Sequence, residues 1–384
     1  MTCDNENTAS TAMAEILSEQ GFDGLASALE VLLNELMLIE REQYLGAAAY
    51  ERSEGRRGHA NGFKPKRMRT RVGELELQVP QTRDSQFYPS VLEKGMRCER
   101  ALRLALAEAY VQGVSTRKMA KVTEELCGLS LSSTQVSRAA KLLDKELENW
   151  RSRELGSYPY LYLDARYEKV RHGGGVVDCA VLVAMGVDDS GQRDILGCSV
   201  SLSEAEVHWR AFLQSLVQRG LRGVTLIVSD AHEGLRSARK AVFGGTPWQR
   251  CQFHLQQNAQ AHVPRQDMKQ STATELKAVF NAPNEHEAKR LLNAFVERHE
   301  KAAPKLAKWA EDNIPEGLMV FQLPEAHQRR LRTSNPLERV NRELKRRTRV
   351  ATLFPNEESC LRLVSAVAME IAEEWQTSKK YLTM

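Results

Sequence analysis

The 384-residue sequence has few cysteines and no long apolar segment. Its longest apolar run, from Cys179 to Val187, is far shorter than the roughly 20 residues that cross a bilayer. The seven cysteines are odd in number and widely scattered, which argues against a disulfide framework and favours a reducing compartment. The first residues include acids and no basic stretch, so we expect no signal peptide. These absences predict a soluble, cytoplasmic protein without a membrane span.

The sequence also lacks a strong overall charge, because its formal net charge is only +4. The positive charge is instead clustered. Between residues 55 and 71 there is no acid, but there are seven bases: Arg56, Arg57, Lys64, Lys66, Arg67, Arg69 and Arg71. Residues 327–349 hold nine Lys and Arg residues against two acids. Such clusters are typical of polyanion-binding proteins, although one basic run alone is more simply a solvated surface.

Changes in composition and hydrophobic spacing divide the chain into six regions. They are a helical N-terminal region (1–50), a basic, partly extended module (51–95), a helix-turn-helix-like DNA-binding region (96–155), the first part of an α/β core (156–262), an all-helical insertion (263–323) and the C-terminal helices of the core (324–384). Leucines recur at three- and four-residue spacing in the first region. This stripe is either a core face or a helix that pairs with a partner in a dimer.

Residues 114–143 contain the pattern of two short helices. Ser115 can cap the first helix, Gly128 can end it, and a Ser/Thr cluster precedes the second. In a helix-turn-helix, the second helix would present Arg138, together with Ser133, Thr134 and Gln135, to the major groove of DNA. An ordinary helical hairpin would have the same pattern.

From residue 156 the chain alternates between strands and helices. We expect strands at 160–164, 176–187, 193–202, 224–230 and 248–253, with helices at 204–219 and 234–242. The predicted order is three strands, a helix, a strand, a helix and a strand. This is the order of an RNase H-like core, which is a mixed sheet with helices on its faces. The first and fourth of these strands end in Asp164 and Asp230.

Three acids, Asp164, Asp230 and Glu338, are candidates for a catalytic metal site. The first two are separated by 66 residues, and the longer gap of 108 residues to Glu338 fits a helical insertion. Three carboxylates suffice to hold two Mg²⁺ ions about 4 Å apart, a site that cuts and joins phosphodiester bonds. The alternatives are structural: the aspartates can simply end strands, and Glu338 can complete a capping box behind Asn335 and Pro336.

Two further features surround these acids. Glu338 lies among bases on its expected helix, of which Arg339, Arg342 and Lys345 would face DNA. The sequence also contains a Cys-x-x-His pair, Cys251 and His254. Zinc would require a second pair nearby, and none has a suitable spacing. A structural or DNA-proximal role near the active site is the better interpretation.

The chain resembles the Mutator-like transposases of bacterial insertion sequences over roughly residues 55–375. The matching segments are Asn61-Gly-Phe63, Thr70-Arg-Val-Gly-Glu74, Tyr110-Val-Gln-Gly-Val-Ser-Thr-Arg117, Leu163-Asp-Ala-Arg166, Val228-Ser-Asp-Ala-His-Glu-Gly-Leu235, Trp248-Gln-Arg-Cys-Gln-Phe-His254 and Thr333-Ser-Asn-Pro-Leu-Glu-Arg339. The Trp-Gln-Arg-Cys-x-x-His string, placed after two Asp motifs, is the most specific of them.

This resemblance implies an Asp-Asp-Glu transposase with an RNase H-like fold interrupted by an all-helical insertion. Asp164, Asp230 and Glu338 fall on the family's triad, and Cys251 and His254 fall on its Cys-x-x-His motif. The resemblance further implies two Mg²⁺ or Mn²⁺ ions, double-stranded DNA with terminal inverted repeats as substrate, a target DNA, and a homodimer or larger assembly. An RNase H-like cellular nuclease or resolvase, and a non-catalytic DNA-binding regulator descended from a transposase, remain alternatives.

Overall fold

The computed structural model describes residues 8–51, 54–84, 86–95, 97–349 and 353–384. The chain forms two compact units, Met1–Leu142 and Leu143–Met384. This division falls inside the region 96–155 that the sequence groups together. Helix α6 (Asp144–Ser152) belongs to the second unit because Arg362 of helix α15 (Glu357–Gln376) donates to Asp144, with 2.5 Å between Nε and Oδ1. None of the described helices is long and apolar enough to cross a membrane.

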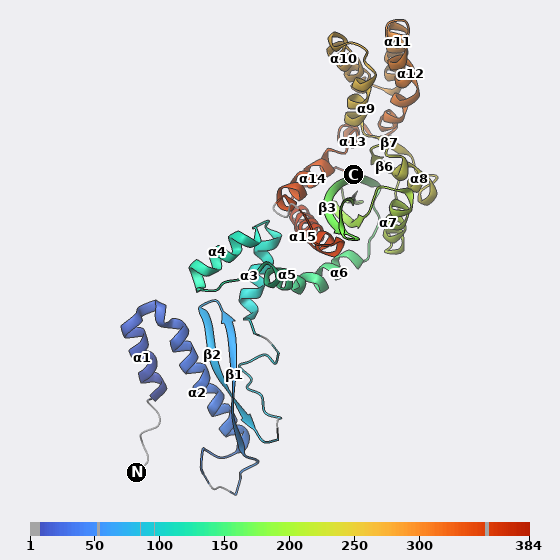
Figure 1. Ribbon diagram of the computed structural model, residues 1–384. Helices are drawn as coiled ribbons and strands as arrows, with labels where there is room; N and C mark the ends of the chain where they lie inside the picture. Colours follow the sequence, from blue (N-terminus) through green and yellow to red (C-terminus); the bar gives the residue numbers. More distant parts are fainter. Residues whose placement is uncertain (1–7, 52–53, 85, 96, 350–352) are drawn as a thin grey trace. The chain divides into compact units, whose positions relative to one another are not determined.

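The first unit begins with two helices and a β-hairpin (Figure 1). Its elements are α1 (Thr8–Gln20), α2 (Leu25–Leu45), β1 (Ala60–Thr70) and β2 (Gly73–Thr82). The antiparallel strands turn tightly between Thr70 and Gly73. Alternation in β2 places Leu75 and Leu77 on one face, where they pack against Met37 of α2. The opposite face of the hairpin carries Arg67 and Arg69 of β1, paired in register with Glu76 and Glu74 of β2.

Three short helices complete the first unit: α3 (Arg100–Val111), α4 (Thr116–Cys127) and α5 (Ser133–Ala140). The predicted cap of α4 is confirmed, because the Ser115 side chain accepts a hydrogen bond from the Lys118 backbone N–H. Gly128 ends this helix in the left-handed conformation, as expected, with φ of 64°. At the start of α5, Ser132 and Gln135 form a capping box.

The second unit is built on a five-stranded mixed sheet with the order β5-β4-β3-β6-β7. Its strands are β3 (Tyr160–His172), β4 (Gly175–Val187), β5 (Arg193–Ser201), β6 (Leu226–Ser229) and β7 (Trp248–Arg250). The first three are antiparallel, whereas β6 runs parallel to β3, and β7 runs parallel to β6. Strand β3 continues well beyond Asp164, where the apolar run ends, because its whole length pairs with β4.

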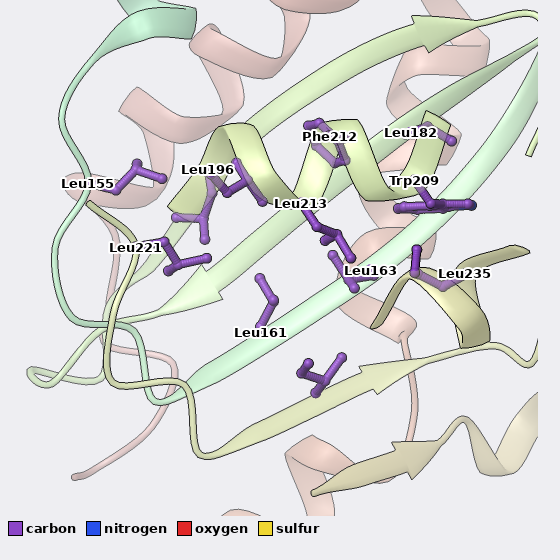
Figure 2. Close-up of a cluster of buried hydrophobic side chains, with 14 of the residues drawn as sticks. Leu155, Leu161, Leu163, Leu182, Leu196, Trp209, Phe212, Leu213, Leu221 and Leu235 are labelled. Atoms are coloured by element: carbon purple, nitrogen blue, oxygen red, sulfur yellow. The ribbon is translucent and has the colours of Figure 1, made fainter. Parts of the chain in front are cut away.

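Helices cover both faces of this sheet (Figure 1). Helices α7 (Glu206–Gln218) and α8 (Glu233–Val242) lie on one face; α13 (Glu325–Leu331), α14 (Asn335–Thr348) and α15 lie on the other. Figure 2 shows Trp209 and Leu213 of α7 packed with Leu161 and Leu163 of β3. Since alternate residues of a strand point to opposite faces, Tyr162 and Asp164 point toward the second layer of helices.

A helical segment separates β7 from the helices of that second layer. It comprises α9 (Gln252–Ala259), α10 (Lys269–Phe280), α11 (Glu285–His299) and α12 (Pro304–Asn313). The segment has its own apolar core, which includes Leu276, Leu292, Phe295 and Leu306. It therefore accounts for the long sequence gap between Asp230 and Glu338.

Candidate active site

Asp164 and Asp230 lie in the middle of the sheet, at the point where the pairing between β3 and β6 ends. The last parallel pair between β3 and β6 joins Leu163 to Ser229, and each aspartate is the next residue along its chain. Parallel strands in equal register place such residues side by side and on the same face. Each carboxylate is held by the following backbone amide: Ala165 N donates to Asp164 Oδ1 at 2.9 Å, and Ala231 N donates to Asp230 Oδ1 at 2.7 Å.

Helices α13 and α14 are attached to the face of β3 that carries Asp164. Tyr162 Oη donates to the Arg330 carbonyl at 3.0 Å. One position further along that face, Asp164 Oδ2 accepts from Asn341 Nδ2 at 2.8 Å, and Arg166 Nη1 donates to the Asn341 carbonyl at 2.8 Å. Successive residues on one face of the strand thus attach the end of α13 and the middle of α14 to the region around Asp164.

Glu338 lies on the same side of α14 as Asn341, because residues three apart are neighbours on a helix surface. Its Oε1 atom is buried and has no hydrogen-bond partner. The predicted capping box is wrong, since α14 begins at Asn335 and the residue before it, Ser334, makes no side-chain cap. Arg342 lies four residues after Glu338, a spacing that favours a helical ion pair, but the two form none among the described residues. The Glu338 carboxylate is therefore not engaged in these structural roles.

The Cys-x-x-His pair lies between the two chain segments that carry Asp230 and Glu338. Cys251 N donates to the Ser229 carbonyl at 2.8 Å, and Cys251 Sγ accepts from the backbone and hydroxyl of Ser334, both at 3.4 Å. Burial raises the pKa of the Cys251 thiol, but hydrogen bonds with His254 and Ser334 outweigh burial, so that the pKa is lowered. The pair thus ties the end of β6 to the start of α14.

His254 is a cation at neutral pH. The hydrogen bond with Cys251 raises its pKa to about 9 against the effect of burial, and the negative charges of Cys251, Asp230 and Asp164 add to the rise. The negative charges of both aspartates therefore favour the protonated imidazole. Within the described residues, no group of three His, Cys, Asp or Glu side chains is arranged to hold a metal ion.

Asp164 has an unusual environment for a carboxyl group. Burial raises its pKa to about 6; the Ala165 amide and His254 oppose this rise, while the charges of Asp230 and Glu204 add to it. Glu204 is a site residue that the sequence did not single out. It stands at the beginning of a predicted helix, where acids are common for helix-dipole reasons, so no local signal distinguishes it.

Glu204 is held between the two segments that carry the aspartates. Its side chain is 12% exposed, and Oε2 lies 3.6 Å from Nδ1 of His232, two residues after Asp230. It also accepts a hydrogen bond from Tyr167, three residues after Asp164. A fourth acid therefore stands near the two aspartates.

The donor chemistry of the three predicted acids fits Mg²⁺ or Mn²⁺, which prefer carboxylate oxygens. The unpartnered, buried Oε1 of Glu338 is consistent with a group that awaits a cation or a proton. Within the described residues, the three acids do not form a closed set of metal ligands. The residues fit such an ion by donor type and by their placement on the fold.

The bases of the first unit that we predicted to contact DNA differ in their exposure and in their hydrogen bonds. Arg57 and Lys64 are exposed. Arg56, in contrast, donates to the carbonyls of Gly58 and Glu51, and Lys66 donates to Tyr88 Oη at 2.9 Å. These hydrogen bonds attach Arg56 and Lys66 to other parts of the first unit.

Arg67, Arg69 and Arg138 line a common cleft in the first unit. Gln135, which we expected to face DNA, uses its Oε1 to accept from the Ser132 amide at 2.8 Å. Thr134 is exposed, and the side chain of Ser133 lies outside the described residues. In the second unit, Arg339, Arg342 and Lys345 are all exposed on α14.

Comparison with known proteins identifies the family of this chain. Residues 1–378 match the family "Transposase, Mutator family". The chain is 59% identical to the transposase for insertion sequence element IS406 of Burkholderia multivorans, covering 98% of this chain and 97% of that protein. It is 42% identical to the transposase for ISRM5 of Rhizobium meliloti, covering 100% and 96%, and 38% identical to the transposase for IS256 in transposon Tn4001 of Staphylococcus aureus, covering 92% of each. The chain belongs to the Mutator family of transposases.

Proposed function

We propose that this protein is an Asp-Asp-Glu DNA transposase. It cuts DNA at the terminal inverted repeats of its element and joins the freed 3′-OH to a target strand. The observation that carries the proposal is the equal register of Asp164 and Asp230 in neighbouring strands, together with the hydrogen bond that joins Asp164 to Asn341, three residues after Glu338 on α14. As part of the proposal, the mixed sheet with helices on both faces is an RNase H-like core, interrupted by the helical segment between β7 and α13.

Phosphodiester cleavage places negative charge on the attacking and leaving oxygens. Two Mg²⁺ or Mn²⁺ ions held by Asp164, Asp230 and Glu338 would neutralise that charge and acidify a water molecule. The chain's own contribution is orientation: the amides of Ala165 and Ala231 fix one oxygen of each aspartate. The remaining oxygens are then directed by the helices and loops around the two aspartates.

Positively charged groups complete the proposed site. The imidazolium of His254 is favoured by the charges of the aspartates and can donate a hydrogen bond to a phosphate oxygen. Arg339, Arg342 and Lys345 extend along the exposed side of α14 from the position next to Glu338. They would hold the DNA backbone against the helix that carries the third acid.

The test uses duplexes that carry the inverted repeats flanking the gene, and scrambled duplexes of equal length. Asp230→Asn and Glu338→Gln should reduce Mg²⁺-dependent nicking of the end duplex by about 1000-fold or more, the equivalent of several kcal/mol, while binding persists. Asp189→Asn is the matched control, because Asp189 is exposed in the turn between β4 and β5. It should nick like the wild type.

Other results would point elsewhere. Full nicking by Glu338→Gln would remove Glu338 from the site. Equal cutting of end and scrambled duplexes would favour a cellular nuclease. End-specific binding without any metal-dependent nicking by the wild type would favour a DNA-binding regulator.

A further inference from the structure

The first unit contains a cleft of about 580 Å³ whose charged lining is almost entirely positive. Its charged residues are Arg67, Arg69, Arg97, Arg103 and Arg138, with Glu74 as the single acid. They come from both strands of the hairpin, from the segment before α3, and from α3 and α5. Three of the five arginines, Arg97, Arg103 and Arg138, lie outside the basic runs of the sequence.

Backbone pairing brings the first three arginines together. Arg67 and Arg69 project from the face of β1 opposite the apolar face that packs on α2. The segment after the hairpin then runs parallel to β1: Arg69 N donates to the Arg97 carbonyl at 3.0 Å, and Glu99 N donates to the Arg69 carbonyl at 2.7 Å. This short bridge places Arg97 beside the arginines of the strand.

Helix packing supplies the other two arginines. Arg103 lies in the first turns of α3, which packs on α5 through Leu106 and Val136. Arg138 is exposed on α5. Arg69 and Arg103 line the cleft together with Cys98, whose thiol pKa is raised by burial and lowered by the charges of these two arginines.

The local acids neutralise only part of this charge. Arg69 lies 3.4 Å from Glu74, and Arg67 pairs with Glu76 at 2.8 Å on the open surface of the hairpin. Within the described residues, Arg97 and Arg138 form no ion pair with the chain. Like charges brought together by the fold repel one another unless an anion lies between them. A cleft of this kind is complementary to a chain of phosphates.

We propose that this cleft binds the phosphodiester backbone of duplex DNA, with one strand passing between β1 and α5. The inference rests on the proposed function and adds the surface that holds the DNA. Guanidinium groups suit this task because their forked N–H donors match phosphate oxygens. Gln135, also in the lining, has its amide oxygen in the capping box of α5. Backbone contacts therefore dominate here, and they position the protein without reading sequence.

The experiment measures the salt dependence of DNA binding by the full chain, using fluorescence anisotropy between about 50 and 200 mM salt. Each lost phosphate contact reduces the slope of log K against log salt by about 0.9. Arg97→Ala and Arg138→Ala should each do so, and the double variant should lose about twice as much. Arg97→Lys should keep most of the slope, because it keeps the charge.

Lys121→Ala is the matched control. Lys121 is 77% exposed on α4, pairs with Glu125 and lies outside the cleft, so its removal should leave the slope unchanged. Since backbone contacts carry no sequence information, the arginine variants should lose the same slope on end and scrambled duplexes. Circular dichroism of each variant establishes that it is folded.

The outcomes separate this inference from the proposed function. Unchanged slopes in folded Arg97→Ala and Arg138→Ala, with normal wild-type binding, overturn the cleft as a DNA site and leave the transposase proposal standing. A loss confined to the end duplex overturns backbone binding, because it indicates base reading. A wild-type protein that binds neither duplex overturns both proposals.

Discussion

Replacement of Asp164 by asparagine should make the second unit more stable at neutral and alkaline pH. The carboxylate is held where burial and two neighbouring acids disfavour its charge, and its pKa rises from 3.8 to about 6. An amide avoids that penalty and still accepts from the Ala165 amide. Its N–H₂ group also has a partner available, because Oδ1 of Asn341 is buried and unpaired, and rotation of that amide presents the oxygen.

The size and sign of this effect follow from proton linkage. Below pH 3.8 the carboxyl is protonated in both states and contributes nothing. Between 3.8 and about 6 the unfolded chain releases the proton and the folded chain keeps it, so that stability falls as pH rises. Above about pH 6 the carboxyl is ionised in both states, and the loss of stability is complete. Each pKa unit is equivalent to about 1.4 kcal/mol. The rise from 3.8 to about 6 therefore means that the ionised Asp164 lowers the free energy of unfolding by at most about 3 kcal/mol.

The assay is urea unfolding of the full chain, followed by tryptophan fluorescence in the presence of EDTA. All five tryptophans (Trp150, Trp209, Trp248, Trp309 and Trp375) lie in the second unit, so the signal reports that unit alone. The midpoint of Asp164→Asn should exceed that of the wild type at pH about 8, and the two should converge near pH 4. Asp178→Asn changes a carboxylate on β4 that is 60% exposed, and it should show no such gain.

Equal or lower stability of Asp164→Asn at pH about 8 would refute the reasoning, because it would mean that the carboxylate is not strained in the folded state. Addition of Mn²⁺ should reduce the advantage of the variant, since a bound cation favours the ionised wild-type group. A wild-type protein that Mn²⁺ does not stabilise would argue against Asp164 as a metal ligand.

Three further predictions concern the surroundings of this carboxyl. Glu204→Gln should lower the pKa of Asp164, measured by NMR titration, because it removes a like charge. Cys251→Ala should return the pKa of His254 from about 9 toward its ordinary value, since the hydrogen bond with the sulfur is the largest cause of the rise. Gly234→Ala should lower the urea midpoint by an amount equivalent to about 1–3 kcal/mol, because a Cβ would approach the Glu204 carbonyl oxygen to 2.0 Å.

Matched controls are available for each. Glu206→Gln removes an acid that pairs with Arg210 on the exposed side of α7, and should leave the Asp164 titration in place. Cys127→Ala alters a thiol of the other unit and should not change His254. Gly245→Ala adds a Cβ that meets nothing within 4 Å. Effects of the same size in these controls would contradict the three predictions.

The parts of the site that the sequence could predict are those with a local signal. The apolar runs that end in Asp164 and Asp230 mark buried strands, and the structure has strands at both places. The sequence could not predict the roles of Asn341 and Glu204. Both reach Asp164 through tertiary packing, and an Asn within a helix or a Glu at a helix start has many ordinary explanations. The capping box predicted with Asn335 as its cap did not form because α14 begins at Asn335 itself, and the hydroxyl of Ser334, the residue before it, donates to Cys251 instead.

That contact of Ser334 with Cys251 also explains how a long helical segment can interrupt a catalytic core without separating its acids. Gln252 N donates to the Arg332 carbonyl at 3.0 Å, next to the two contacts between Ser334 and Cys251 Sγ. The chain therefore leaves the sheet and returns to it at the same point. Because the entropy of closing a loop grows only slowly with its length, the segment between these ends can be long at little cost. For the proposed chemistry, the important contacts are those that join the two ends of the segment, because they hold the start of α14, the helix that carries Glu338, next to the strand that precedes Asp230.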